Sequence, residues 1–278
     1  MHRIMLTSRI FNNIDETINY AKKNNYYGIE WYLNQLRLSI NPEKADQFFK
    51  KLDHYPDMYF TFHFPTTDVE IGHCNKEYAN ISLQYLKMYI DFLRPWLKEN
   101  KRKTIFTLHV GANSIPMKYL SWRRTKENLK VLGDYIFNAN GLLCLENLKM
   151  GWTAQPEKLI ELAEYAGINI TFDSGHAASS PLVRNNIFSL VDYLNKIKSL
   201  VRYVHFYNYE TLKEGYHVPP GKWENISSIW KKILTLKDVK GITIELTKLT
   251  ELEWTYQLIN NHSIKVKSGK TNQTNRHA

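Results

Sequence analysis

Short runs of apolar and β-branched residues recur along the chain, separated by longer stretches with helical periodicity. The runs are nearly continuous in apolar character, as expected for strands buried on both faces. Such strands alternating with helices are typical of βα units in a parallel sheet. Eight units predict a closed (β/α)8 TIM barrel in a single domain. The runs are Ile4 to Thr7, Tyr27 to Tyr32, Met58 to Phe64, Thr104 to Val110, Leu142 to Leu148, Ile168 to Asp173, Arg202 to Tyr207 and Ile242 to Leu246.

Helix boundaries between these runs carry the expected local signals. Pro42 and Pro156 each stand where a first helical turn is expected, and an acidic residue follows each of them. Gly167 directly precedes the sixth run, which fits the preference for glycine just past a helix end. A doubly wound sheet is the alternative fold. No Gly-x-Gly-x-x-Gly turn follows the first run, which disfavours a dinucleotide-binding version of that fold.

The chain of 278 residues is 43% hydrophobic, which is enough for one large core. We expect a barrel domain over residues 1–262 and a disordered, polar and basic tail over residues 263–278. The net charge of +10 would attract polyanions such as nucleic acids. Part of this charge lies in the tail, however, and lysine is abundant alongside asparagine, isoleucine and tyrosine. We therefore favour a solvated basic surface over a nucleic-acid partner.

Cysteine usage and hydropathy indicate the compartment. Cys74 and Cys144 are too few and too far apart for a disulfide framework or a cysteine zinc module. No apolar stretch approaches membrane-spanning length, and the first residues show no cleavage-site pattern. The expectation is a soluble, cytoplasmic protein without a membrane partner.

Metal-competent side chains stand at the carboxyl ends of the apolar runs. Glu146, Asp173 and Glu245 lie within or at the ends of such runs, where a charged group costs several kcal/mol unless it is paired or bound to an ion. His205 lies in the seventh run. In a closed barrel these ends surround one axis, so the side chains should converge on one cavity. A site rich in oxygen ligands suits Mn²⁺, Mg²⁺ or Co²⁺, whereas added histidines favour Zn²⁺.

Other histidines are candidates for additional metal ligands or substrate contacts. Any single histidine at a strand end is more often a structural residue. Chemistry-bearing residues at six strand ends together are harder to explain in that way, so we interpret them as a divalent metal site. The additional candidates are His63, His109, His176 and His217.

The order of these motifs resembles the xylose isomerase-like TIM barrel superfamily, which includes endonuclease IV and the sugar phosphate isomerases and epimerases. The resemblance spans nearly the whole chain: Glu-Asn, Asp-x-Gly-His, a histidine, His-x-Pro-Pro-Gly and a glutamate follow one another. It implies that His176 contacts substrate or a further ion, and that His63 and His109 correspond to a zinc-binding pair of the endonuclease branch. The core metal ligands that it implies are Glu146, Asp173, His205 and Glu245.

One departure bears on the choice of branch. The endonuclease carries an Asp-x-His pair for its third zinc, whereas this chain has Gly215 two residues before His217. We therefore favour an isomerase or epimerase acting on a sugar, sugar phosphate or similar polyhydroxylated carbonyl compound. The metal would polarise the carbonyl, while Glu146 and Glu245 transfer the proton and His176 holds a substrate oxygen.

Two alternatives stay open. An endonuclease IV-like zinc phosphodiesterase acting on abasic DNA is favoured by His63, His109 and the net charge. A metal-dependent lyase or dehydratase on the same barrel would also begin with proton abstraction next to a carbonyl. Sequence alone does not separate a lyase from an isomerase.

Overall fold

Parallel strands form a closed barrel in the computed structural model, which describes residues 3–36, 42–111, 115–211, 213 and 215–268. Around the barrel the order is β1-β10-β7-β6-β5-β4-β3-β2, so barrel strands that follow one another in the chain are neighbours. The predicted (β/α)8 barrel is confirmed. The strands are β1 (Ile4–Thr7), β2 (Gly28–Tyr32), β3 (Tyr59–His63), β4 (Thr104–Leu108), β5 (Gly141–Glu146), β6 (Asn169–Asp173), β7 (Val201–Phe206) and β10 (Gly241–Ile244).

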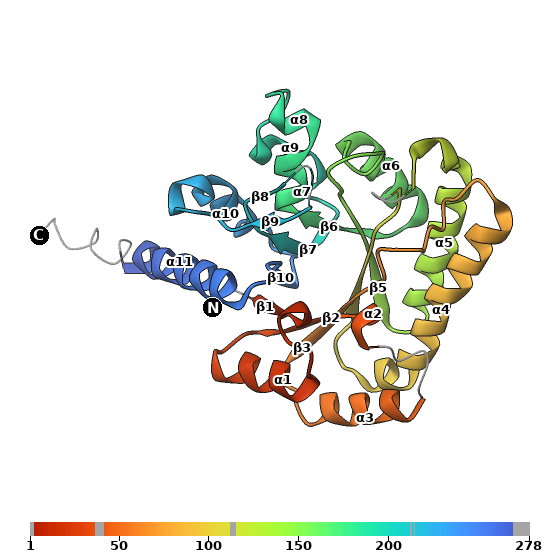
Figure 1. Ribbon diagram of the computed structural model, residues 1–278, viewed down its shortest axis with the longest axis horizontal. Coiled ribbons are helices and arrows are strands. Elements are labelled where there is room, and N and C mark those ends of the chain that lie inside the picture. Colours follow the sequence, from red (N-terminus) through yellow and green to blue (C-terminus); the bar gives the residue numbers. More distant parts are fainter. Residues whose placement is uncertain (1–2, 37–41, 112–114, 212, 214, 269–278) are drawn as a thin grey trace, which may run out of the picture.

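Helices surround the strands on the outside, as Figure 1 shows. As expected, α3 and α6 begin at Pro42 and Pro156, and α6 ends before Gly167, whose φ of 66° is left-handed. The helices are α1 (Ile14–Lys23), α2 (Leu33–Leu36), α3 (Pro42–Asp53), α4 (Lys76–Glu99), α5 (Trp122–Phe137), α6 (Pro156–Ala166), α7 (Ser174–Ser179), α8 (Pro181–Arg184), α9 (Leu190–Ile197), α10 (Ser227–Ile233) and α11 (Leu249–Ser268).

Side chains fill the inside of the barrel below the carboxyl ends of its strands. A cluster of buried residues from five different strands packs together there. Above it, the hydroxyl of Tyr203 bonds the hydroxyls of Thr61 (2.8 Å) and Thr243 (2.7 Å). Alternation along β7 places His205 on the same inner face as Tyr203. The barrel is therefore a packed core whose chemistry has to lie at the carboxyl end. The cluster consists of Met5, Tyr59, Ile105, Cys144 and Tyr203.

A small hairpin interrupts the βα pattern between β7 and β10. Its strands β8 (Tyr209–Glu210) and β9 (His217–Val218) are antiparallel and lie outside the barrel sheet (Figure 1). Cross-strand pairing sets Glu210 opposite His217. This hairpin therefore brings two polar side chains together near the carboxyl end of β7.

The last described element is α11, which runs six residues past the expected domain boundary at residue 262 and ends at Ser268. The remainder of the expected tail, residues 269–278, lies outside the described residues. Within the part of the chain that the structure describes, no helix combines the length and apolar character needed to cross a bilayer. Cys74 is exposed, Cys144 is buried, and both are free thiols.

Candidate metal centre

The four predicted core ligands meet at the carboxyl end of the barrel and are here called the core group. Glu146 ends β5, Asp173 ends β6, His205 lies near the end of β7, and Glu245 directly follows β10. All four are buried, and one ligand atom of each lies within 4.8 Å of the others. Strand pairing places Asp173 beside His205. The structure brings these residues together as expected, while their role as metal ligands stays a prediction.

The core group has the chemistry of a cation site. Each member keeps one buried polar atom without a hydrogen bond among the described residues: Glu146 Oε1, Asp173 Oδ2, His205 Nδ1 and Glu245 Oε2. Burial raises the pKa of Asp173 well above its ordinary value, and the charges of Glu146 and Glu245 add to this rise against the opposing effect of His176. A divalent ion would satisfy these atoms and relieve the repulsion between the carboxylates. The residues therefore fit a bound metal.

Imidazole rings keep two of the carboxylates in their charged form. Burial favours the neutral form of Glu146, but His109 and His205 hold its pKa well below the ordinary value. Burial likewise acts against the charge of Glu245, whose pKa His205 and His217 hold well below the ordinary value. The lowered pKa values favour the ionised form of both glutamates, which is the form that binds metal ions.

Hydrogen bonds at one ring nitrogen orient four of the candidate histidines. A ring that donates from one nitrogen to a fixed oxygen keeps the other nitrogen available as a ligand. The donating atoms and their acceptors are His63 Nδ1 to the Phe64 carbonyl (2.7 Å), His176 Nδ1 to the Asn147 carbonyl (3.1 Å), His217 Nδ1 to the Glu245 carbonyl (2.7 Å) and His205 Nε2 to the Glu30 carboxylate (3.0 Å).

A first flanking group consists of His63, His109 and Glu146. Oε2 of Glu146 lies 3.2 Å from Nε2 of His63 and 3.0 Å from Nε2 of His109. Glu146 therefore belongs to both this group and the core group. Such a shared carboxylate is suited to bridge two neighbouring ions.

A second flanking group contains His176, Glu210 and His217. Glu210 on β8 stands opposite His217 on β9, and directly paired residues of a hairpin present their side chains on one face. Oε2 of Glu210 lies 3.3 Å from Nε2 of His176. Two imidazoles and one carboxylate form a ligand set used by transition metals. Each additional histidine predicted from the sequence thus falls into one of the two flanking groups.

Gly215 makes room for the carboxylate of the second flanking group. In the sequence, this glycine stands where the endonuclease branch has the aspartate of its Asp-x-His pair, so an acidic ligand is missing at this position. In the structure its φ is +63°, and a Cβ added there would lie only 2.9 Å from Oε1 of Glu210. Glu210, on the opposite strand of the hairpin, places a carboxylate beside His176 and His217. The sequence held little signal for this, since a two-residue strand has no detectable periodicity.

Replacing Gly215 by alanine is expected to displace Glu210 and weaken metal binding to the second flanking group by about 10- to 100-fold. The added Cβ would press on the carboxylate, and alanine disfavours the left-handed backbone by roughly 1 kcal/mol. Metal bound per chain after dialysis measures the effect. Gly221→Ala is the matched control, because its Cβ would meet only Asn225 at 3.8 Å. Equal metal content in Gly215→Ala and the wild type would contradict the prediction.

Sequence comparison finds limited similarity to other proteins. No family model matches the chain. An uncharacterised protein of Methanocaldococcus jannaschii is 31% identical over 137 residues, which are 49% of this chain and 57% of that protein. The chain therefore matches little more than half the length of this curated relative.

Comparison of folds is more extensive. A D-tagatose 3-epimerase-like protein superposes with a TM-score of 0.70 and 15% identity, covering 96% of this chain and 99% of the other. A xylose isomerase domain protein from Planctomyces limnophilus superposes with a TM-score of 0.68 and 14% identity, covering 96% and 98%. The chain therefore shares the TIM-barrel fold of these two proteins. At these identities the likeness establishes the architecture, and the chemistry has to be argued from the site.

Each of the three groups contributes to the lining of one cavity of about 430 Å³: Glu245 from the core group, His63 and His109 from the first flanking group, and all three members of the second. Arg9 and Tyr32 also line it. Nη1 of Arg9 lies 3.3 Å from Oε1 of Glu245, and the Tyr32 hydroxyl donates to the same oxygen. These two side chains hold Glu245 in place and leave its Oε2 facing His205 at 3.2 Å.

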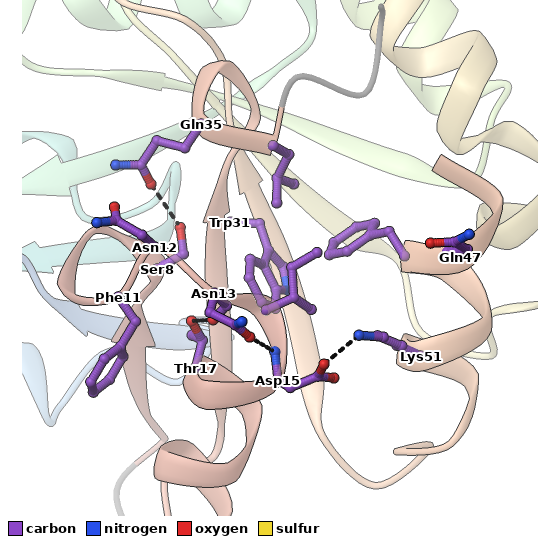
Figure 2. A pocket seen from close by; sticks show the side chains of 13 residues that line it. Ser8, Phe11, Asn12, Asn13, Asp15, Thr17, Trp31, Gln35, Gln47 and Lys51 are labelled. Carbon is purple, nitrogen blue, oxygen red and sulfur yellow. Dashed lines mark hydrogen bonds and ion pairs between the residues drawn. The ribbon is translucent and has the colours of Figure 1, made fainter. Parts of the chain in front are cut away.

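A second cavity, of about 380 Å³, lies outside the barrel wall, where β2, α1 and α3 come together (Figure 2). The rings of Trp31 and Phe48 form part of its lining and pack edge to face with centroids 5.1 Å apart. Asp15 and Lys51 form an ion pair of 2.5 Å at its edge, so their charges cancel. None of the three metal-competent groups found among the described residues lines this cavity. We therefore assign the chemistry to the cavity at the barrel end.

Proposed function

We propose that the chain is a metal-dependent hydrolase of phosphate esters. One observation carries the proposal: three groups of metal-competent side chains lie at the end of the barrel, each with at least one member lining the same cavity, and Glu146 belongs to two of them. Divalent ions bound there would supply Lewis-acid activation of water and would neutralise charge on a phosphoryl group.

The surroundings of Glu146 favour hydrolysis over proton transfer. Its Oε2 lies 3.2 Å from His63, 3.0 Å from His109 and 3.3 Å from His205. A carboxylate that acts as acid and base has to alternate between its ionised and neutral forms in each turnover. Although burial opposes them, the facing imidazoles hold the pKa of Glu146 well below its ordinary value. With three imidazoles facing one of its oxygens, Glu146 is placed as a ligand shared between two groups.

Donor types indicate which ions each group would hold. Imidazoles supply two of the three ligands in each flanking group, which favours Zn²⁺. Carboxylates supply three of the four ligands in the core group, which also suits Mn²⁺, Mg²⁺ or Co²⁺. Arg9 at the edge of the cavity would donate to phosphoryl oxygens, since guanidinium groups form charge-assisted bonds to phosphate.

A metal-dependent isomerase or epimerase of sugars or sugar phosphates is the second candidate. Glu146 and Glu245 come from separate strands and face Nδ1 of His205 at 3.3 and 3.2 Å. Two carboxylates beside one ion suit proton transfer next to a polarised carbonyl, with His176 holding a substrate oxygen. The fold shared with a D-tagatose 3-epimerase-like protein supports this candidate. A lyase or dehydratase would use the same groups.

Parallel assays distinguish the two candidates. Protein loaded with Zn²⁺ or Mn²⁺ is incubated with an abasic-site duplex and a chromogenic phosphate diester. In a second set it is incubated with ketoses and their phosphates in D2O. We expect ester cleavage and no deuterium incorporation next to the carbonyl. Deuterium incorporation without ester cleavage would replace the first candidate by the second.

Glu210→Gln provides an internal control for this comparison. Hydrolysis by three cooperating groups should fall by about 100-fold, because the second flanking group loses its carboxylate. Proton transfer at the core group should fall much less, since Glu210 touches that reaction only through its contact with His176. Glu164→Gln, an exposed substitution on α6, is the matched variant that should leave either activity intact.

A further inference from the structure

Lys149 is a buried ammonium group beside the second flanking group. It lies three residues after Glu146, in the loop that follows β5, and its exposed fraction is 8%. Its Nζ donates to Oε1 of Glu210 at 2.7 Å. Neither candidate reaction uses this ammonium group. A buried charge is costly unless a well-placed partner compensates it, so the pair with Glu210 needs an explanation.

This lysine engages one oxygen of Glu210 and leaves the other available. Oε2 of Glu210 faces Nε2 of His176 at 3.3 Å, and no described residue forms a hydrogen bond with it. Lys149 therefore fixes the carboxylate with its second oxygen turned toward the ligand set. Its positive charge lies next to the position where a cation would bind.

The three groups differ in the charge that they offer to a cation. The core group contains three carboxylates, one of which pairs with Arg9. The first flanking group shares Glu146 with it. The second flanking group has one carboxylate, whose charge Lys149 balances, and two histidines that bind ions in their neutral form. Like charges a few ångströms apart repel, and a buried site screens them only in part. A divalent ion is therefore held least firmly in the second flanking group.

We infer that Lys149 makes the second flanking group the last of the three to bind a divalent ion and the first to lose it. The inference rests on the proposed metal centre. It gives the protein two forms that differ by one ion, in a ratio set by the free-ion concentration. Hydrolysis would then respond to free ion over a range in which the other two groups stay filled.

Zinc binding to the wild type and to Lys149→Gln tests the inference. Each protein is dialysed against buffers of fixed free Zn²⁺, and bound zinc per chain is measured by elemental analysis. Glutamine keeps an N–H donor for Glu210 but removes the charge. We expect the last ion to bind Lys149→Gln at free Zn²⁺ about tenfold lower than in the wild type, with the earlier steps unchanged. An unchanged or higher midpoint would overturn the inference, because Lys149 would then serve only as a support.

Two further variants assign the last step to this group. Lys149→Arg keeps the charge and should bind the last ion as the wild type does. Glu210→Gln should lose this step and keep the earlier ones; if it binds as many ions as the wild type, the weak site lies elsewhere and the inference fails. If thermal unfolding shows that Lys149→Gln is not folded, the same titration is carried out with Lys149→Met.

The same titration separates the inference from the proposed function. A wild-type protein that binds no zinc at any concentration would overturn the metal centre and the inference together. Stepwise zinc binding that is insensitive to the charge at residue 149 would overturn the inference alone.

Discussion

Glu146→Gln is expected to lower kcat/KM for phosphate ester hydrolysis by about 1000-fold or more. Glutamine keeps the shape of the side chain but removes the charge that faces His63, His109 and His205. Because Glu146 is a member of two groups, its loss should weaken ion binding at both. Steady-state kinetics with the chromogenic diester, together with zinc bound per chain, measure the effect.

Glu245→Gln serves as a comparison within the same centre. It should also abolish turnover, but it should weaken ion binding at the core group alone, since Glu245 belongs only to that group. Glu164→Gln on the exposed face of α6 should behave as the wild type. Retention of full activity by Glu146→Gln would remove this residue from the reaction. Equal loss of ions in both glutamine variants would contradict the bridging role of Glu146.

The barrel was predictable from the sequence because a strand that is buried on both faces consists of an unbroken run of apolar residues. The predicted run from Ile4 to Thr7 matches β1, and the run from Thr104 to Val110 exceeds β4 by two residues. The excess arises because apolar character continues into the loops at the carboxyl ends, which are also buried. Hydrophobicity therefore predicted where the strands lie in the sequence, but it did not predict the residues at which they end.

The core group was predictable for a related reason. A carboxylate in an apolar run is costly, so Glu146, Asp173 and Glu245 stood out once a closed barrel was expected. Glu30 satisfies the same criterion, although it lies in the middle of its run and not at the end. It is fully buried and accepts from His205 at 3.0 Å, so it orients a core ligand. A charged residue at any position of an apolar run, and not only at its end, therefore indicates a side chain of the site.

The second flanking group shows where sequence reasoning ended. Its carboxylate depends on the pairing of Glu210 with His217 in a hairpin whose strands have two residues each. Pairing over such a short length is decided by the turn and by tertiary contacts, neither of which has a periodic signature. Gly215, taken from sequence as a lost ligand, is the position that gives Glu210 its space.

Removal of bound ions by a chelator is expected to lower the free energy of unfolding by about 4 kcal/mol for each ion present at 1000 times its Kd. Unfolded chain lacks the preformed site, so binding to the native state alone supports the fold. In the core group, ion removal leaves Glu146, Asp173 and Glu245 buried together with unsatisfied oxygens. Urea unfolding of ion-loaded and chelated protein, followed by circular dichroism, measures the difference.

Glu146→Gln links this stability change to the site. The variant should show a much smaller shift in its urea midpoint on chelation, because the two groups that share Glu146 already bind ions weakly. Readdition of Zn²⁺ should restore the wild type and have a much smaller effect on the variant. Identical midpoints for loaded and chelated wild type would show that the crowded carboxylates are tolerated without a cation. In that case protons would have to balance the buried negative charge, and Asp173 would be the first residue to bind one. Burial and the neighbouring glutamates raise the pKa of Asp173, against the opposing effect of His176.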